Sequence, residues 1–370
     1  MEALYKIPLE PKSISLFLEE EKDFLIGLLQ LLGEINEGEL NEKTKLALTQ
    51  LKEKLPEFVE RIFPPKDFTS QIIALQSIAQ ILSQTVGKTK FSKIGVRKKW
   101  ISIGNGYLGR IVDEQYEIAI LLYLVAAVYQ TRALAKVQTS PQYRYYHISS
   151  LAALLSAIEY IEQLNPDLEE HYAKPFYQML QLRKLEVAAE VTKSEAFLAR
   201  KQGDFEKASK LFAGAASYRF SMMNFDLPED SDNRVKIFAS TELGMACFYV
   251  AVGLSNKSES EQAYYYLLKA KGYFENATKL SENNTELLEA ANKRLDLVNP
   301  YIDRIKDTIE EKPVELEKIP DPQPLMVHIE PKPIMNPKDE EIMRICSNCT
   351  SKIKWTDKCP ECGEHIIPLE

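Results

Sequence analysis

A chain of 370 residues is long enough to bury a large core, either in one big domain or in two. Its net charge of −8 and pI of about 5.4 argue against a surface built as a whole for nucleic acid. No apolar run reaches the roughly 18 residues that span a bilayer, and the longest, 118–129, fits a helix buried in a soluble core.

The N-terminal part of the chain predicts three helices from apolar residues at helical spacing. The three stripes run through 17–32, 48–62 and 72–82, the second after Asn41 as an N-cap. The pattern then breaks at 87–110, where five glycines predict a loop with a short hairpin.

A basic run lies inside this break, in a stretch from Gln84 to Ile103 that contains no acidic residue. Its members are Lys88, Lys90, Lys93, Arg97, Lys98 and Lys99. Such a cluster attracts an anionic membrane surface or phosphates. The alternative is a solvated loop whose lysines keep it soluble.

Helical periodicity resumes after Asp113 and continues to about residue 311. The predicted helices are 114–138, 143–164, 172–201, 204–224, 233–255, 259–280 and 284–311, with breaks at residues such as Pro141, Pro166, Gly203 and Pro228. Cys247 lies in an apolar stretch and is expected to pack as a small hydrophobic residue.

Residues 196–215 resemble a tetratricopeptide repeat, in which small residues let two antiparallel helices approach closely. Gly203 and Asp204 form the predicted turn, and Phe205 and Phe212 fill the space between the helices. A second, weaker match to the repeat pattern at 263–270 has the wrong spacing for a regular repeat array. The predicted fold is therefore mostly α, an irregular helical solenoid with a tetratricopeptide-like central hairpin.

Seven prolines between Lys312 and Met343 end the helical pattern in an acidic background. This segment is either a free linker or an extended chain in a groove of the helical body. We expect three parts: a helical domain at 1–312, a proline-rich tail at 313–343, and a small C-terminal module at 344–370.

The C-terminal module carries two CxxC knuckles, which predict a structural zinc ribbon. Its four ligands are Cys346, Cys349, Cys359 and Cys362. The alternative is a pair of disulfides. The N-terminus shows no secretory signal, so we expect a cytoplasmic protein with reduced thiols and Zn²⁺ as the ligand.

The helical part resembles the Bro domain of Alix-like ESCRT accessory proteins. The similarity runs through Ile7-Pro8-Leu9, Tyr116-Glu117 with the hydrophobic helix that follows, Lys210-Leu211 in the hairpin, and Asn299-Pro-Tyr301 near the end. Leu124 stands where the family usually has Asn. The resemblance covers roughly residues 5–335 and is distributed rather than concentrated in one motif.

The resemblance implies a non-enzymatic adaptor for membrane remodelling or protein sorting. Bro domains bind an amphipathic C-terminal helix of an ESCRT-III filament subunit on an apolar patch of the central hairpin, by helix-in-groove recognition. A patch position of the family falls on Leu211, and the nearby apolar candidates are Phe197, Phe205 and Phe212. For Phe205 and Phe212, packing inside the hairpin is the competing interpretation.

Catalytic motifs such as a P-loop, GxSxG or HExxH are absent from the sequence, so no enzyme activity is expected. One alternative function is a general peptide-binding scaffold of the tetratricopeptide class. Another is a nucleic-acid or ribosome-associated factor, which the charge balance of the ribbon disfavours. The ribbon is expected to contact a second protein; ubiquitin is the weaker choice, because Trp355 lies between the knuckles and not before the first.

Overall fold

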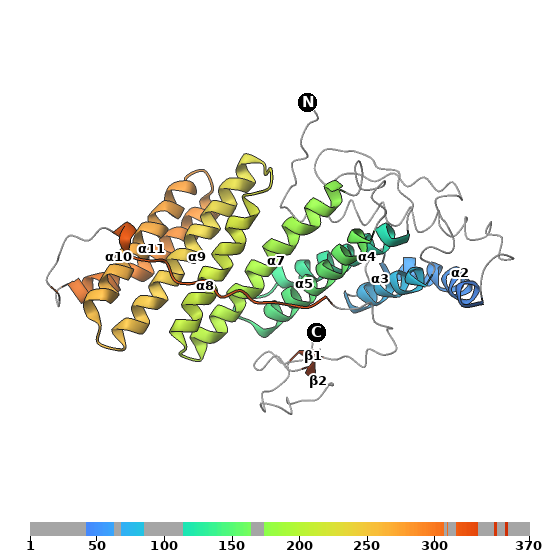
Figure 1. Cartoon of the computed structure of the whole chain (residues 1–370), viewed down its shortest axis with the longest axis horizontal. Coiled ribbons are helices and arrows are strands. Elements are labelled where there is room, and N and C mark those ends of the chain that lie inside the picture. The colour runs from blue at the N-terminus through green and yellow to red at the C-terminus, as the bar shows by residue number, and fades with distance from the viewer. Residues whose placement is uncertain are drawn as a thin grey trace. The chain divides into compact units, whose positions relative to one another are not determined.

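The computed structural model describes residues 42–62, 68–84, 114–163, 174–306, 309, 316–331, 344–345 and 352–353. Within these ranges the regular structure is almost entirely helical (Figure 1). The elements are α2 (Glu42–Ile62), α3 (Phe68–Ser83), α4 (Glu114–Leu134), α5 (Pro141–Glu162), α7 (Lys174–Lys201), α8 (Phe205–Met222), α9 (Glu229–Ser255), α10 (Ser260–Leu280), α11 (Thr285–Lys306), η4 (Leu316–Lys318), β1 (Arg344–Ile345) and β2 (Lys352–Ile353). The predicted mostly helical fold is confirmed.

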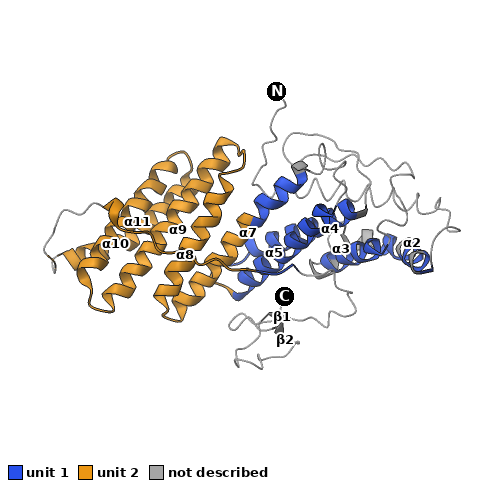
Figure 2. Ribbon diagram, in the orientation of Figure 1, with its two compact units in different colours: residues 1–137, 141–184, 329–370 blue, residues 138–140, 185–328 orange. Residues whose placement is uncertain are grey.

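The chain divides into two compact units (Figure 2). Unit 1 comprises 1–137, 141–184 and 329–370, and its helices α2, α3, α4 and α5 each pack against the next along the chain. Unit 2 comprises 138–140 and 185–328. In unit 2, α9 packs against α8 and α10, and α10 packs against α11.

Two helices, α4 and α9, each contain a long apolar window that is mostly buried. By length and composition alone each is apolar enough to cross a membrane. The most apolar window of α4 is 78% buried and that of α9 is 67% buried. Every residue from Ile118 to Tyr129 is buried, as predicted, and Cys247 is fully buried in α9. The described structure therefore uses both as core helices.

Local sequence signals account for the helix ends in the central hairpin. Gly203 has φ of +79°, a left-handed conformation that glycine adopts at low cost, and it ends α7. Asp204 then caps α8, because its side chain accepts a hydrogen bond of 2.9 Å from the backbone N–H of Lys207. The predicted turn between the two helices is confirmed.

Several predictions fall on residues outside the described ranges. These are the first apolar stripe, Asn41, the basic run from Lys88 to Lys99, and the four cysteines of the ribbon. The predicted domain boundaries at 312–313 and 343–344 also fall in or beside such ranges. Strands β1 and β2 pair antiparallel, with Arg344 opposite Ile353, and the chain that joins them carries Cys346 and Cys349.

Candidate docking site on the central hairpin

The central hairpin of unit 2 is packed by aromatic rings. The ring of Phe212 on α8 lies 5.4 Å from that of Phe197 on α7, edge to face, and stacks 5.5 Å from Tyr249 of α9. Phe205 stacks on the same tyrosine at 6.2 Å. Buried alanines (Ala196, Ala199, Ala208 and Ala215) let the helices approach closely. The predicted packing of Phe212 against the facing helix of the hairpin is confirmed, whereas Phe205 packs against Tyr249 of α9.

The four residues proposed to meet a partner do not share one environment. Leu211 and Phe212 are each only 1% exposed and belong to the apolar core of unit 2. This corrects the expectation that they face a partner, because neither is accessible in this structure. Phe197 and Phe205 are partly buried at the edge of the same core.

Part of the proline-rich tail is docked on unit 2. For the described residues, the tail is therefore an extended chain on the helical body and not a free linker. We call residues 316–328 the strap; in Figure 1 it runs from η4 to α8. It begins on α10, where the hydroxyl of Tyr266 donates to the carbonyl oxygen of Pro320 at 3.2 Å and that of Tyr273 donates to Asp321 at 2.8 Å.

Lys269 completes this contact with α10. Its ammonium group lies 2.9 Å from the Asp321 carboxylate and donates a hydrogen bond to the carbonyl oxygen of Ile319. Tyr266, Lys269 and Tyr273 occur at i, i+3 and i+7, so they lie along one face of the helix. This face of α10 holds the first half of the strap by polar contacts.

The second half of the strap lies along α8. The backbone N–H of Leu325 donates to the carbonyl oxygen of Lys210 at 2.8 Å, and the Tyr218 hydroxyl donates to the carbonyl oxygen of Val327 at 3.2 Å. Between these two points, a Cβ added at Gly214 would lie 2.1 Å from the Leu325 carbonyl oxygen. Only glycine therefore admits the strap this close to the helix.

Leu211 is next to this contact. It precedes Gly214 by three residues and Tyr218 by seven, so all three lie on one side of α8. Val327 of the strap packs against the same apolar core that contains Leu211. The burial of Leu211 therefore occurs on the side of α8 where the strap lies.

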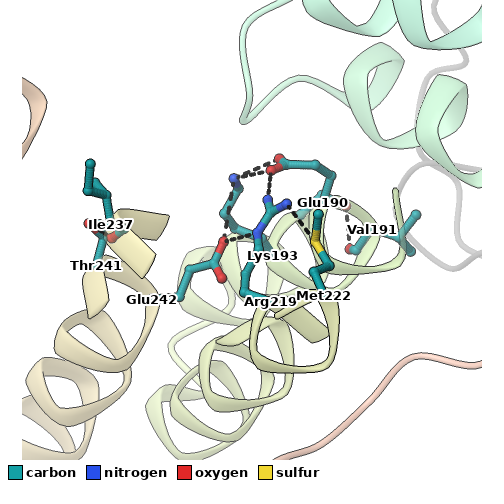
Figure 3. A network of polar contacts seen from close by, with 9 residues as sticks. Glu190, Val191, Lys193, Arg219, Met222, Ile237, Thr241 and Glu242 are labelled. Atoms are coloured by element: carbon teal, nitrogen blue, oxygen red, sulfur yellow. Dashed lines mark hydrogen bonds and ion pairs between the residues drawn. The ribbon is translucent and has the colours of Figure 1, made fainter. Parts of the chain in front are cut away.

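A cluster of four charged side chains joins α7, α8 and α9 inside unit 2 (Figure 3). The Arg219 guanidinium donates a hydrogen bond to Glu190 and lies 3.6 Å from Glu242. Lys193 lies 2.6 Å from Glu190 and 3.9 Å from Glu242. Two cations thus face two carboxylates, and Arg219 also stacks on the Phe238 ring at 5.1 Å.

Burial and neighbouring charges shift the pKa values of Arg219 and Glu242 in opposite directions. Burial alone lowers the pKa of Arg219, but the carboxylates of Glu242, Glu190 and Glu186 outweigh it and raise that pKa above its ordinary value. For Glu242, burial, with a smaller contribution from Glu190, raises the pKa more than Arg219 and Lys193 lower it. The cluster thus holds α7, α8 and α9 in register and would be costly to break on one side.

The sequence contains signals for the strap contacts that helical periodicity alone does not reveal. Gly214 is a glycine inside a helical pattern, which costs about 1 kcal/mol against Ala and so indicates a packing reason. Tyr266, Lys269 and Tyr273 form a row of two tyrosines and a lysine at helical spacing. Within the described ranges, no group of three or more His, Cys, Asp or Glu side chains is placed to hold a metal ion.

These features define a class of protein: a helical scaffold whose central hairpin holds an extended segment of chain on its surface. Solved structures narrow the fold further. The one described as "ALIX BRO1 CHMP4C complex" has a TM-score of 0.62 at 12% identity, over 92% of this chain and 96% of the other.

Two further structures have the same fold. "Crystal Structure of ALIX in complex with the SIVmac239 PYKEVTEDL Late Domain" gives a TM-score of 0.60 at 14% identity, and the match spans 79% of this chain and 45% of that one. "Structure basis for endosomal targeting by the Bro1 domain" gives 0.50 at 13% identity, over 80% and 84% of the two chains.

The helical part therefore has the fold of the Bro1 domain, as the sequence resemblance predicted. At these identities the likeness establishes the fold alone. No protein-family model matches the sequence, and no curated protein does.

Proposed function

We propose that this protein is a non-enzymatic adaptor that binds an amphipathic helix of an ESCRT-III-like filament subunit. The observation that carries the proposal is the shared fold with a BRO1 domain in complex with CHMP4C, which spans 92% of this chain. The aromatic hairpin of α7 and α8 supports it, because a rigid, packed hairpin offers a preorganised surface to a helix.

The binding test is a titration of the full chain with synthetic C-terminal helices of ESCRT-III-like proteins from the same genome. We expect micromolar binding to a helix with apolar anchors at i, i+3, i+4 and i+7, and none when those anchors are replaced by Asp. Leu211→Asp is unsuitable as a site variant, because a charge at a position 1% exposed would unfold the hairpin.

Phe197→Ala is the sharper site variant, because this predicted anchor is still reached by solvent. Loss of a central aromatic anchor weakens binding by about 30-fold in typical interfaces. Phe220→Ala is the matched control, since Phe220 is 46% exposed on the same hairpin. Absence of binding by every helix tested would overturn the proposal. Equal effects of Phe197→Ala and Phe220→Ala on binding would mean that the binding site does not lie at Phe197.

The membrane and metal parts of the proposal concern residues outside the described ranges. The basic run from Lys88 to Lys99 supplies the charge for contact with an anionic membrane on the cytoplasmic side. Cys346, Cys349, Cys359 and Cys362 have the donor chemistry and spacing of a structural zinc site, and the ribbon would contact a second protein.

A peptide-binding scaffold is the second candidate function, and the strap favours it. The strap is an extended segment held by α8 and α10, so these helices already bind one peptide-like ligand. Preference for a free peptide with the strap sequence over any amphipathic helix in the same titration would favour this function over the first.

A further inference from the structure

Two arginines of unit 2 meet at the hydroxyl group of a buried tyrosine. Arg200 lies in the last turn of α7, Arg294 lies within α11, and Tyr249 belongs to α9. The guanidinium of Arg200 donates a hydrogen bond to the Tyr249 oxygen, and the charge of Arg294 acts on both of these groups. We call Arg200 and Arg294 the arginine pair.

The core of unit 2 fixes where these side chains lie. Tyr249 is 4% exposed, and its ring stacks on that of Phe205 at 6.2 Å. Val298, one turn after Arg294 on the same side of α11, is buried in the same core. Arg294 is half-buried, whereas Arg200 is exposed. The packing therefore holds two guanidinium groups and one hydroxyl group together at the edge of the core.

The arginine pair has no acidic partner among the described residues, where each of its polar contacts is with Tyr249 or with the other arginine. Its sequence neighbours Lys201 and Lys293 are exposed and form no ion pair in the same ranges. Burial lowers the pKa of Arg294 below its ordinary value, Tyr249 opposes this shift, and the like charge of Arg200 adds to it. Two cations are thus left uncompensated beside each other in a chain of net charge −8.

The helix ends do not account for this arrangement. A cation in the last turn of a helix is favourable beside the free carbonyl groups there. At the end of α7, however, the carbonyl oxygens of 198–200 already accept hydrogen bonds from the backbone N–H groups of 202–204. Arg294 is more than two turns from either end of α11 (Thr285–Lys306). A ligand explains the arginine pair better than its own helices do.

We propose that Arg200, Tyr249 and Arg294 form a binding site for a phosphoryl group. Two guanidinium groups carry two positive charges, which a phosphate monoester dianion neutralises and a single carboxylate does not. The Tyr249 proton, which no contact among the described residues uses, supplies a further donor. The phosphoryl group belongs either to a small phosphate or to a phosphorylated side chain of a partner. The inference does not depend on the proposed function.

The test is a calorimetric titration of the full chain with inorganic phosphate and with a capped glycine peptide that contains one phosphoserine, at constant ionic strength set by chloride. Acetate and the unphosphorylated peptide are the ligand controls. The site variants are Arg200→Gln and Arg294→Gln, which remove a guanidinium, and Tyr249→Phe, which keeps the stacked ring. Arg234→Gln is the matched control, since Arg234 is exposed on α9 about 22 Å along the helix from Tyr249. Circular dichroism confirms that each variant retains its helices.

We expect each arginine variant to weaken binding by about 30-fold and Tyr249→Phe by about fivefold, because the arginine variants lose a charge together with its hydrogen bonds. Arg234→Gln should match wild type. Equal affinity for inorganic phosphate and for the peptide supports a small phosphate as the ligand, and tighter binding of the peptide supports a phosphorylated side chain. Binding by neither, equal binding of acetate, or equal effects of Arg234→Gln and the site variants overturns the inference.

Discussion

The helices of unit 2 and the chain that follows them are held by different kinds of contact. Helices α7 to α10 bury aromatic rings and alanines against one another, and α7, α8 and α9 share a buried charge cluster. The strap relies mainly on main-chain carbonyls, tyrosine hydroxyls and one ion pair. We expect each buried contact of the first region to cost several kcal/mol to break, and each polar contact of the second about 1 kcal/mol.

This difference decides which part of unit 2 is easier to displace. A binding surface made from the core cannot be switched by small forces, because packed interiors do not deform continuously. A polar segment laid over that surface is switchable, because each of its contacts is worth only about 1 kcal/mol net. We therefore expect the strap to leave the helices before the hairpin itself opens.

The largest expected effect in the core is that of Phe212→Ala. This side chain is 1% exposed and contacts Phe197 and Tyr249, so its removal leaves a cavity. We expect the free energy of unfolding to fall by about 4 kcal/mol, measured from the urea midpoint by circular dichroism. Phe220→Ala, on the exposed side of the same helix, should cost less than about 1 kcal/mol. Equal losses would remove the distinction between the two sides of α8.

The next effect tests the charge cluster. Arg219→Met removes the cation between Glu190 and Glu242, and we expect a loss of about 3 kcal/mol at pH 8. Arg234→Met is the control, since Arg234 is exposed and lies 5.5 Å from the same Phe238 ring. It should cost less than about 0.5 kcal/mol.

The loss in Arg219→Met should also depend on pH. Burial raises the pKa of Glu242 in the folded protein, and removal of Arg219 takes away a group that lowers it. A carboxyl with a raised folded pKa binds a proton more tightly when folded, so it favours the folded state below its ordinary pKa, and this contribution is lost as pH rises through the folded value. The deficit against wild type should therefore shrink between pH 8 and pH 5. A deficit that grows over this range would contradict the assignment.

Helical periodicity predicted most of the helices of both units, and the errors have physical causes. Helix α8 was predicted at 204–224 and spans Phe205–Met222. Helix α9 begins at Glu229, four residues before its apolar pattern, because the acidic residues of its first turn favour a helix N-terminus.

The candidate site was harder to predict than the fold. Periodicity identifies the apolar side of α8 but does not say what covers it, so Leu211 was expected at the surface although the strap lies beside it. The strap is docked partly through main-chain groups, which leave no side-chain pattern in the sequence. On α8, the sequence sign of the strap's main-chain contact is Gly214, a helix position where a side chain would clash with the Leu325 carbonyl.

The smallest effect on the helices should come from removing the proposed zinc. Metal binding supplies the folding energy of a short four-cysteine module, so a chelator should unfold the ribbon alone. We expect release of one zinc per chain, with the urea midpoint of the helices shifted by less than about 0.5 kcal/mol. Cys346→Ser is the matched variant, and it should bind zinc more weakly with the same midpoint.

Thiol titration of the same sample distinguishes zinc from disulfides. Zinc-bound thiolates react slowly with a disulfide reagent until the metal is removed, and four thiols should then become reactive. Cys247 should not react with the reagent until the helices unfold, because burial raises its pKa to about 12 and so keeps the thiol protonated. Four thiols that appear only after a reductant, with no zinc released, would establish disulfides instead. Reaction of a fifth thiol in the folded protein would mean that the core around Cys247 opens readily. The contrast between the helices of unit 2 and the chain that follows them would then not hold.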